Sequence, residues 1–254
     1  MAALRPRTRI RPYLGAAGAL LAVLLLGGCG LPSFGMPSSI TKQGGRTYSL
    51  WQVMFALAIV VGGLVWGLIF WSVIRYRRRR GDDGLPENQH PYNIPVEVVY
   101  TVVPILLVIG IFIGSLGVQH RNDSLSKKPD VNIEVVGFQW QWQFRYLDSG
   151  FTVTGNSVAG NPPVMVLPVG STISFKLRAA DVAHSFWVPK FLMKRDLIPG
   201  IPNQIDVTTQ RQLDTYEGRC AEYCGLDHWR MNFKVKVVSQ TDYRSWLRDE
   251  KGRR

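Results

Sequence analysis

The chain has 254 residues, of which 46% are hydrophobic, and it carries a formal net charge of +12 at pH 7. This length allows one large domain, or one modest domain with appendages, and excludes a long multidomain enzyme. The basic residues gather near residues 5–11, 75–80 and 251–254. Such clusters can bind nucleic acid, but here they border apolar segments, so we interpret them as signals of membrane topology and expect no nucleic-acid partner.

Residues 1–28 have the pattern of an export signal. A basic start is followed by the apolar run LGAAGALLAVLLLGG and then by Cys29. The segment LLGGC resembles the signal of a bacterial lipoprotein, in which the cysteine becomes the lipidated first residue after cleavage. We therefore predict lipidation of Cys29; the alternative is an uncleaved signal anchor with an incidental cysteine.

Two apolar segments follow. Residues 50–74 contain no charged side chain and are long enough to cross a hydrocarbon core about 30 Å thick. Trp51 and Trp71 lie near the ends of this segment, as aromatic residues do at membrane interfaces. The second segment, residues 96–118, is apolar except for Glu97 near its start. Both are predicted to be transmembrane helices.

The loop between these segments contains the run RYRRRRGDDG. Loops rich in Lys and Arg stay on the cytoplasmic side. Two spans then place the mature amino terminus and everything after His120 outside, in agreement with the export signal. The sequence predicts a bacterial plasma-membrane protein whose carboxy-terminal domain lies on the outer face.

From Val131 onward, the sequence predicts short strands separated by turns. The stretches VNIEVVGFQWQWQFRY, VMVLPVGSTISFKLRA, NQIDVTT and MNFKVKVVS alternate apolar and polar residues, wholly or in part. Glycine and proline separate them. This pattern predicts a β-sandwich or a Greek-key barrel. The charged amphipathic segment after residue 241 is expected to be a surface helix or a frayed tail.

The segment CAEYCGLDHWRM, residues 220–231, concentrates four soft or borderline metal ligands: Cys220, Cys224, His228 and Met231. Two cysteines in an oxidising compartment can form a disulfide, but that would leave His228 and Met231 unexplained. Zinc takes Cys and His ligands, and methionine is a poor ligand for it. A blue-copper site needs only one cysteine.

A second histidine, His184 in DVAHSFWVP, completes a set of two Cys, two His and one Met. Two thiolates can bridge two copper ions, and each ion then takes one histidine. The weak positions fall to Met231 and to a backbone carbonyl between the cysteines. Thiolate, thioether and imidazole together select copper, so we predict a binuclear copper site.

Four stretches carry a close resemblance to a known family: CAEYCGLDHWRM, DVAHSFWVP, GFQWQWQFRY and NIPVEVVYTVVP. Together they resemble subunit II of haem–copper cytochrome c oxidases over residues 47–238. The pattern C-x-E-x-C-G-x-x-H-x-x-M is typical of the copper-A centre of that family and of nitrous oxide reductase, which needs a larger chain. The resemblance implies a two-helix transmembrane hairpin followed by an all-β, cupredoxin-like sandwich or barrel domain.

The resemblance also implies roles for individual residues. Its copper ligands would be Cys220 and Cys224 as bridging thiolates, His184 and His228 as terminal imidazoles, Met231 as a weak thioether, and the backbone carbonyl of Glu222. The Glu222 side chain would bind a magnesium ion shared with subunit I.

Two further residues match family positions. Trp140 aligns with the residue through which electrons enter, although Trp140 and Trp142 could instead be ordinary strand packing. Glu97 aligns with a glutamate that begins a proton channel into subunit I. The alternative for Glu97 is an interfacial charge at a helix start, where the helix dipole stabilises a carboxylate.

The implied function is that of a subunit of a proton-pumping cytochrome-c oxidase, which is not catalytic alone. Electrons would come from a soluble or membrane-tethered cytochrome c and leave for haem a of subunit I, which also holds haem a3 and copper B; subunit III is a further expected partner. There are two rival hypotheses. One is a quinol oxidase subunit, which typically lacks the copper ligands, and the other is a membrane-anchored copper carrier.

The expected organisation runs in chain order. It comprises a lipoprotein-type signal peptide at 1–28, an exported linker at 29–46, a first transmembrane helix at 47–76, a basic cytoplasmic loop at 77–95, a second transmembrane helix at 96–119, a linker at 120–130, the copper-A domain at 131–240 and a charged tail at 241–254.

Overall fold

The computed structural model describes residues 32–77, 91–210 and 213–252, and the structural statements here concern those residues. The predicted signal peptide and Cys29 lie outside this part of the chain, as does most of the basic loop. Residues from Gly35 onward belong to one compact unit.

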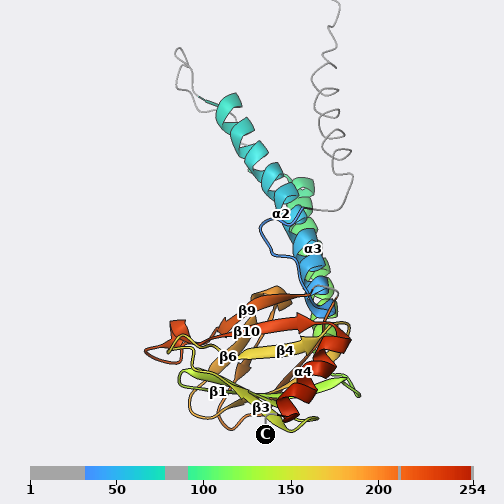
Figure 1. The fold of residues 1–254 in the computed structure, drawn as a ribbon. Coiled ribbons are helices and arrows are strands. Elements are labelled where there is room, and N and C mark those ends of the chain that lie inside the picture. The colour runs from blue at the N-terminus through green and yellow to red at the C-terminus, as the bar shows by residue number, and fades with distance from the viewer. Residues whose placement is uncertain (1–31, 78–90, 211–212, 253–254) are drawn as a thin grey trace, which may run out of the picture. The chain divides into compact units, whose positions relative to one another are not determined.

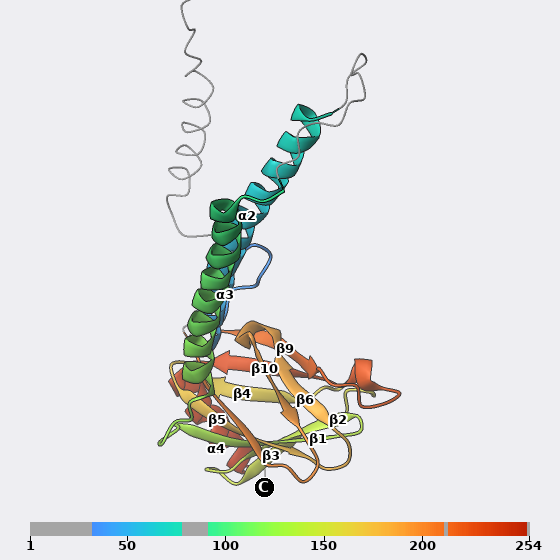
Figure 2. The same cartoon turned by 180° about the vertical axis from the view of Figure 1, so that it is seen from behind.

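Two long apolar helices run side by side (Figures 1 and 2). Helix α2 spans Lys42–Arg75 and helix α3 spans Ile94–Asp123. Both are long and apolar enough to cross a membrane, and their large apolar side chains are exposed. Each helix extends past its apolar segment. Helix α2 begins at Lys42 and is capped by Thr41, whose hydroxyl accepts a hydrogen bond from the Gly44 amide at 3.0 Å. Helix α3 continues through polar residues to Asp123.

The strands of the described residues form a two-layer β domain, visible in Figures 1 and 2. Within the described residues, one sheet has the strand order β3-β2-β1-β5-β8 and the other the order β4-β10-β9-β6-β7. Strand β1 runs parallel to β5 and β10 runs parallel to β4, whereas the other pairs are antiparallel. The strand bounds are β1 Val131–Phe138, β2 Gln141–Tyr146, β3 Phe151–Thr154, β4 Val164–Pro168, β5 Thr172–Ala179, β6 His184–Val188, β7 Met193–Leu197, β8 Asn203–Thr208, β9 Asp214–Cys220 and β10 Asn232–Val238.

The core between the sheets is aromatic on the side of the cysteines. In β2, Trp142 and Phe144 alternate with half-buried polar residues and are themselves fully buried. Phe233 of β10 meets both rings edge-on, at centroid distances of 5.3 and 5.4 Å, and stacks on Phe186 of β6 at 5.1 Å. Edge-to-face pairs of this kind stabilise beyond their buried area. The expected fold class, two long helices followed by an all-β sandwich, is confirmed.

The segment before α2 is part of this β domain. Ile40 is 1% exposed and belongs to the core. Its amide donates to the Lys190 carbonyl at 3.0 Å, and its carbonyl accepts from the Gln210 amide at 2.8 Å. A Cβ on Gly44 would lie 2.2 Å from the Phe191 carbonyl oxygen. The start of α2 therefore needs a glycine, because the backbone approaches the short helix η1 (Pro189–Phe191) that follows β6.

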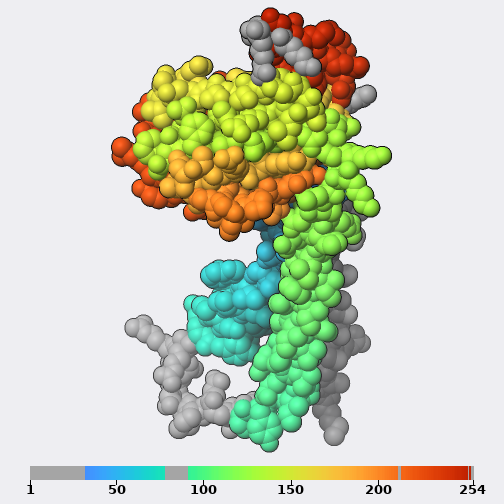
Figure 3. Space-filling view, turned by 90° about the horizontal axis from the view of Figure 1, so that it is seen from below, coloured from blue at the N-terminus to red at the C-terminus, as the bar shows by residue number. Residues whose placement is uncertain are grey.

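The charged carboxy-terminal segment is a helix, α4, at Gln240–Gly252. Its Trp246 packs edge-on against Tyr146 and Phe151, at centroid distances of 5.1 and 4.9 Å. In Figure 3 the red atoms of α4 lie against one edge of the β domain. Of the two forms expected from sequence, the structure therefore has the surface helix.

Candidate metal centre

Two buried thiols form the middle of the candidate site. Cys220 is the last residue of β9, and Cys224 lies in the loop that leads to β10. Both are free thiols and both are buried. Their Sγ atoms lie 3.9 Å apart, much farther than the 2.05 Å or so of a disulfide bond. The arrangement is that of two separate sulfur ligands.

Each sulfur has its own histidine. The Nδ1 atom of His184 lies 3.9 Å from the Cys220 Sγ, and the Nδ1 atom of His228 lies 3.5 Å from the Cys224 Sγ. The Met231 Sδ lies 3.7 Å from the Cys224 Sγ, and the Glu222 carbonyl oxygen lies 3.2 Å from the Cys220 Sγ. The structure thus brings together all six residues named from the sequence, in two sets of one thiol, one imidazole and one weak donor.

The fold fixes these ligands through neighbouring strands. Strand β6, which begins with His184, pairs with β9 so that Phe186 lies opposite Cys220. The carbonyl of Met231 accepts hydrogen bonds from the Cys220 amide at 3.0 Å and from the Trp142 indole at 3.2 Å. Both ends of the loop between β9 and β10 are therefore attached to the sheet and to the core.

Inside the loop, Gly225 turns the chain. Its φ of +113° is open to glycine but strained for other residues. The carbonyl of Gly225 accepts from the His228 amide at 3.2 Å, at the start of the short helix η2, His228–Arg230. The turn brings the His228 ring back toward Cys224.

His184 is oriented by Asp181. The Nε2–H of His184 donates to Oδ1 of Asp181 at 2.8 Å, which leaves Nδ1 facing the sulfur. Asp181 also accepts from the backbone amides of Gln139 at 2.7 Å and Val182 at 2.6 Å. Burial raises the pKa of Asp181, but these three donors outweigh it and hold the pKa below its usual value. A carboxylate that holds the second nitrogen of a histidine is a common partner of metal-binding imidazoles.

The two thiols differ in acidity. Burial raises the pKa of Cys220, but hydrogen bonds with His184 and nearby backbone lower it overall. Burial and the neighbouring Cys220 raise the pKa of Cys224 to about 12. Two thiolates this close cannot both be charged in a buried site unless positive charge lies between them. The pair is therefore suited to bind cations.

The donor set decides which cation fits. Two thiolates, two imidazoles, a thioether and a carbonyl form a soft set that selects copper. Tetrahedral zinc takes four ligands from Cys and His and leaves the thioether unused. The ligand atoms of three of these residues, His184, Cys220 and Cys224, all lie within 4.8 Å of one another. The residues present fit a copper-A-type site.

Trp140 and Trp142 have different environments, although they are two residues apart. Trp142 is fully buried in β2, and its indole meets the His184 ring edge-on at 6.2 Å. Trp140 precedes β2, in the turn after β1, and is half-buried. Its indole N–H donates to the Cys224 carbonyl at 3.1 Å. The rule that alternate residues share a sheet face does not apply, because Trp140 is not in the strand.

The structure does not bring Glu97 to the metal ligands. It lies in the first turn of α3, where its Oε1 accepts from the Asn93 amide at 3.0 Å while Asn93 Oδ1 accepts from the Val96 amide at 3.4 Å. This reciprocal pair resembles a capping box, with the glutamate one position later than usual. Glu97 therefore has at least a local role in starting the helix.

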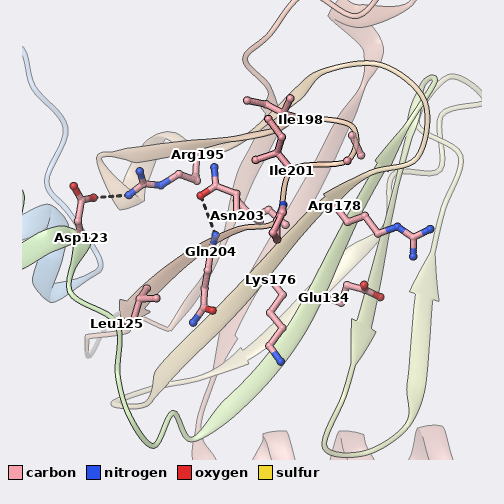
Figure 4. Close-up of a pocket in the computed structure, with 14 residues that line it drawn as sticks. Asp123, Leu125, Glu134, Lys176, Arg178, Arg195, Ile198, Ile201, Asn203 and Gln204 are labelled. Carbon is pink, nitrogen blue, oxygen red and sulfur yellow. Dashed lines mark hydrogen bonds and ion pairs between the residues drawn. The ribbon is translucent and has the colours of Figure 1, made fainter.

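A cavity of about 810 Å³ lies elsewhere on the β domain (Figure 4). Lys176 and Arg178 of β5 and Glu134 of β1 line it, together with Ile198 and Ile201 of the loop between β7 and β8. None of the six candidate ligands lines this cavity.

Three large side chains of the loop between β9 and β10 are exposed. Tyr223, Leu226 and Trp229 expose 77%, 81% and 75% of their surface. The Tyr223 ring also meets the His228 ring at 5.8 Å. Gln139, which the sequence did not single out, donates from Nε2 to the Cys224 carbonyl at 2.7 Å. Its position beside Trp140 is the one sequence feature that could have drawn attention to it.

Comparison with known proteins agrees with this geometry. The profile of the family "Cytochrome C oxidase subunit II, periplasmic domain" matches residues 131–238. A Streptomyces avermitilis protein described as a probable cytochrome c oxidase subunit 2 is 40% identical over 94% of this chain and 86% of its own length. The chain belongs to the cytochrome c oxidase subunit II family. It is thus part of a haem–copper terminal oxidase complex rather than a free-standing enzyme.

Two further proteins are similar to this chain. Subunit 2 from Mycobacterium tuberculosis strain H37Rv is 32% identical over 84% of this chain and 74% of its own length. The crystal structure of the periplasmic domain of subunit II from Bradyrhizobium japonicum is 31% identical, with a TM-score of 0.46 over 51% of this chain and 99% of that chain. For this subunit II, two candidate transmembrane helices and a periplasmic-domain match fit a membrane protein with its carboxy-terminal domain outside.

Proposed function

We propose that this subunit II receives electrons from a cytochrome c at a binuclear copper-A centre and passes them to haem a of subunit I, where oxygen is reduced to water and protons are pumped. The observation that carries the proposal is the pairing of donors. Each buried thiol has one imidazole nitrogen within 3.9 Å, and the thiols lie 3.9 Å apart. Two adjacent half-sites, each with one thiol and one imidazole, suit two copper ions.

The six ligands would be those named from the sequence: His184, Cys220, Glu222 through its carbonyl, Cys224, His228 and Met231. The bound copper pair would supply a one-electron couple. The protein's part is to hold these donors rigidly, and the buried Cys220, Cys224, Met231 and His184 are well placed for that. A site whose donors are held rigidly reorganises little when the charge of the metal pair changes, and this favours fast electron transfer.

Trp140 is the residue we assign to receiving electrons. Trp140 is half-buried, so part of the residue remains accessible to a partner, and its indole N–H donates to the carbonyl of Cys224 at 3.1 Å. A hydrogen bond from the surface indole to a ligand residue gives a short connected route between the donor protein and the site.

Other assignments follow the family. The exposed side chain of Glu222 is free to reach a magnesium ion shared with subunit I. Glu97 would begin the proton channel, in addition to capping α3. We propose the organisation expected from the sequence, with a cleaved signal and a lipidated Cys29, in a bacterial plasma membrane. Subunits I and III and a soluble or tethered cytochrome c are the proposed partners.

The proposal is tested with the full chain in detergent, reduced and then loaded with copper. We expect two coppers per chain and an electron paramagnetic resonance signal whose hyperfine structure shows one unpaired electron shared by both nuclei. One copper with a localised signal would overturn the binuclear site. Purification from its host without a haem-bearing large subunit would favour a copper carrier instead. Mass spectrometry of the mature amino terminus tests the lipid on Cys29.

A further inference from the structure

Gln139 connects the two parts of the chain that carry the metal ligands. It lies between β1 and β2, in neither the His184 segment nor the Cys220–Met231 loop. Its backbone amide donates to Asp181, whose other oxygen holds His184. Its side-chain amide donates to the Cys224 carbonyl at 2.7 Å. One residue thus contacts the support of one ligand and the backbone of another.

The side chain also packs closely on the turn beside Cys224. A Cβ added to Gly225 would lie 3.2 Å from the Gln139 Nε2 and 3.3 Å from the Trp140 ring. The Cys224 carbonyl accepts from both of these neighbours, at 2.7 and 3.1 Å. A carbonyl with two donors directed at it has little freedom to rotate. Fixing that peptide restricts the backbone that carries the Cys224 side chain.

We propose that Gln139 is a positioning residue of the metal centre: it holds the Cys224–Gly225 peptide against the Asp181–His184 pair, and so keeps the two half-sites in register. This inference rests on the proposed function only where copper is measured, that is, in the rate of copper loss and in copper reduction. Gln139 itself is exposed on its outer side, so the competing role is that of a surface residue that contacts the donor cytochrome.

The test compares Gln139→Met with wild type in the full chain. Methionine keeps the length of the side chain and the backbone N–H to Asp181 but removes the amide donor. Gln141→Met is the matched control, because Gln141 is a half-buried glutamine two residues along, at the start of β2. Three quantities are measured: amide hydrogen exchange of residues 221–231 in the reduced, metal-free chain, the rate of copper loss to a chelator, and copper reduction by dithionite and by cytochrome c.

We expect about two- to fivefold faster exchange and copper loss in Gln139→Met, since one neutral, partly exposed hydrogen bond is removed and Trp140 still donates to the same carbonyl. Gln141→Met should match wild type. Unchanged amide exchange together with an unchanged rate of copper loss would overturn the proposal. If reduction by cytochrome c is the only quantity that changes, Gln139 contacts the donor cytochrome instead. If wild type binds no copper, the proposed function fails, and the metal-free exchange still decides whether Gln139 holds the loop.

Discussion

Replacing Asp181 by asparagine tests how strongly one carboxylate outside the ligand set supports copper binding. The two oxygens of Asp181 accept three hydrogen bonds, from His184 Nε2 and from the amides of Gln139 and Val182. Asparagine has one acceptor oxygen and one NH₂ group. Whichever way the amide is placed, at least one N–H donor then faces another donor.

The magnitude follows from these contacts. A hydrogen bond to a charged group contributes about 1.5–3 kcal/mol, and the lower end applies because the Asp181 side chain is 33% exposed. A loss of about 1.5 kcal/mol corresponds to roughly tenfold weaker binding, at 1.36 kcal/mol per factor of ten. This is at the lower edge of the ~10–100-fold effect known for partners of metal ligands.

The assay is a copper competition titration of the reduced full chain against a chelator of known affinity. Asp214→Asn is the control, since Asp214 begins β9, the strand that ends in Cys220, and is exposed. Thermal unfolding of the metal-free variants separates loss of fold from loss of affinity. Copper affinity of Asp181→Asn within twofold of wild type would refute the reasoning that Asp181 holds His184 in place.

Three further predictions concern the domain and its thiols. Tyr146→Phe should lower the free energy of unfolding by about 2–3 kcal/mol, measured by thermal or chemical unfolding, because the buried hydroxyl donates to the Val166 carbonyl at 2.9 Å and accepts from its amide at 2.8 Å. Gly218→Ala should lower it by about 1–3 kcal/mol in the same experiment, since the new Cβ would lie 2.2 Å from the Phe233 ring. Copper affinity should rise with pH between about 6 and 8, because the Cys224 thiol, with its pKa raised to about 12, must release its proton to bind; titration with copper at several pH values measures this.

The tyrosine variant and the glycine variant each have a counterpart that should have little or no effect. Tyr243→Phe changes a second buried tyrosine. Its hydroxyl has no hydrogen-bond partner among the described residues, so stability should change by less than about 0.5 kcal/mol. Gly45→Ala places a methyl group in open space on α2 and should not destabilise. A tyrosine or glycine variant equal to its control would contradict the packing argument, and a copper affinity independent of pH would mean that both thiols are already ionised in the metal-free chain.

The candidate metal ligands could be named from the sequence because most of them lie in one short segment. Cys220, Cys224, His228 and Met231 fit within a single loop between two strands, and their spacing alone restricts the chemistry. His184 needed a further argument, since it lies far away in sequence and reaches the site only through the pairing of β6 with β9. Its ligand chemistry was visible in the sequence, but its distance to the sulfurs was not.

The supports of the site were harder to predict because they depend on where strands begin. The alternation of residues around GFQWQWQFRY gave no sign that β1 ends at Phe138 and that Gln139 and Trp140 form a turn. Strand parity would have given Trp140 and Trp142 the same face. The turn separates them, so that one is core and the other contacts Cys224. Hydrogen bonds to a backbone carbonyl, such as those from Gln139 and Trp140, leave no periodic pattern in a sequence.

The burial of Ile40 means that the β domain is discontinuous in sequence. Its core includes chain from before the first membrane helix, and the Gln43 side chain accepts a hydrogen bond from the Thr208 amide, 165 residues later. A fragment that begins after α3 therefore lacks a core side chain and should be less stable than the full-length domain.

The burial of Ile40 also determines when the core can close during synthesis. At about 5–20 residues per second, a ribosome needs roughly 8–33 s to travel from Gln43 to Thr208. During that interval Ile40 lacks the strands that will cover it. The core around Ile40 can therefore close only after these strands have been synthesised.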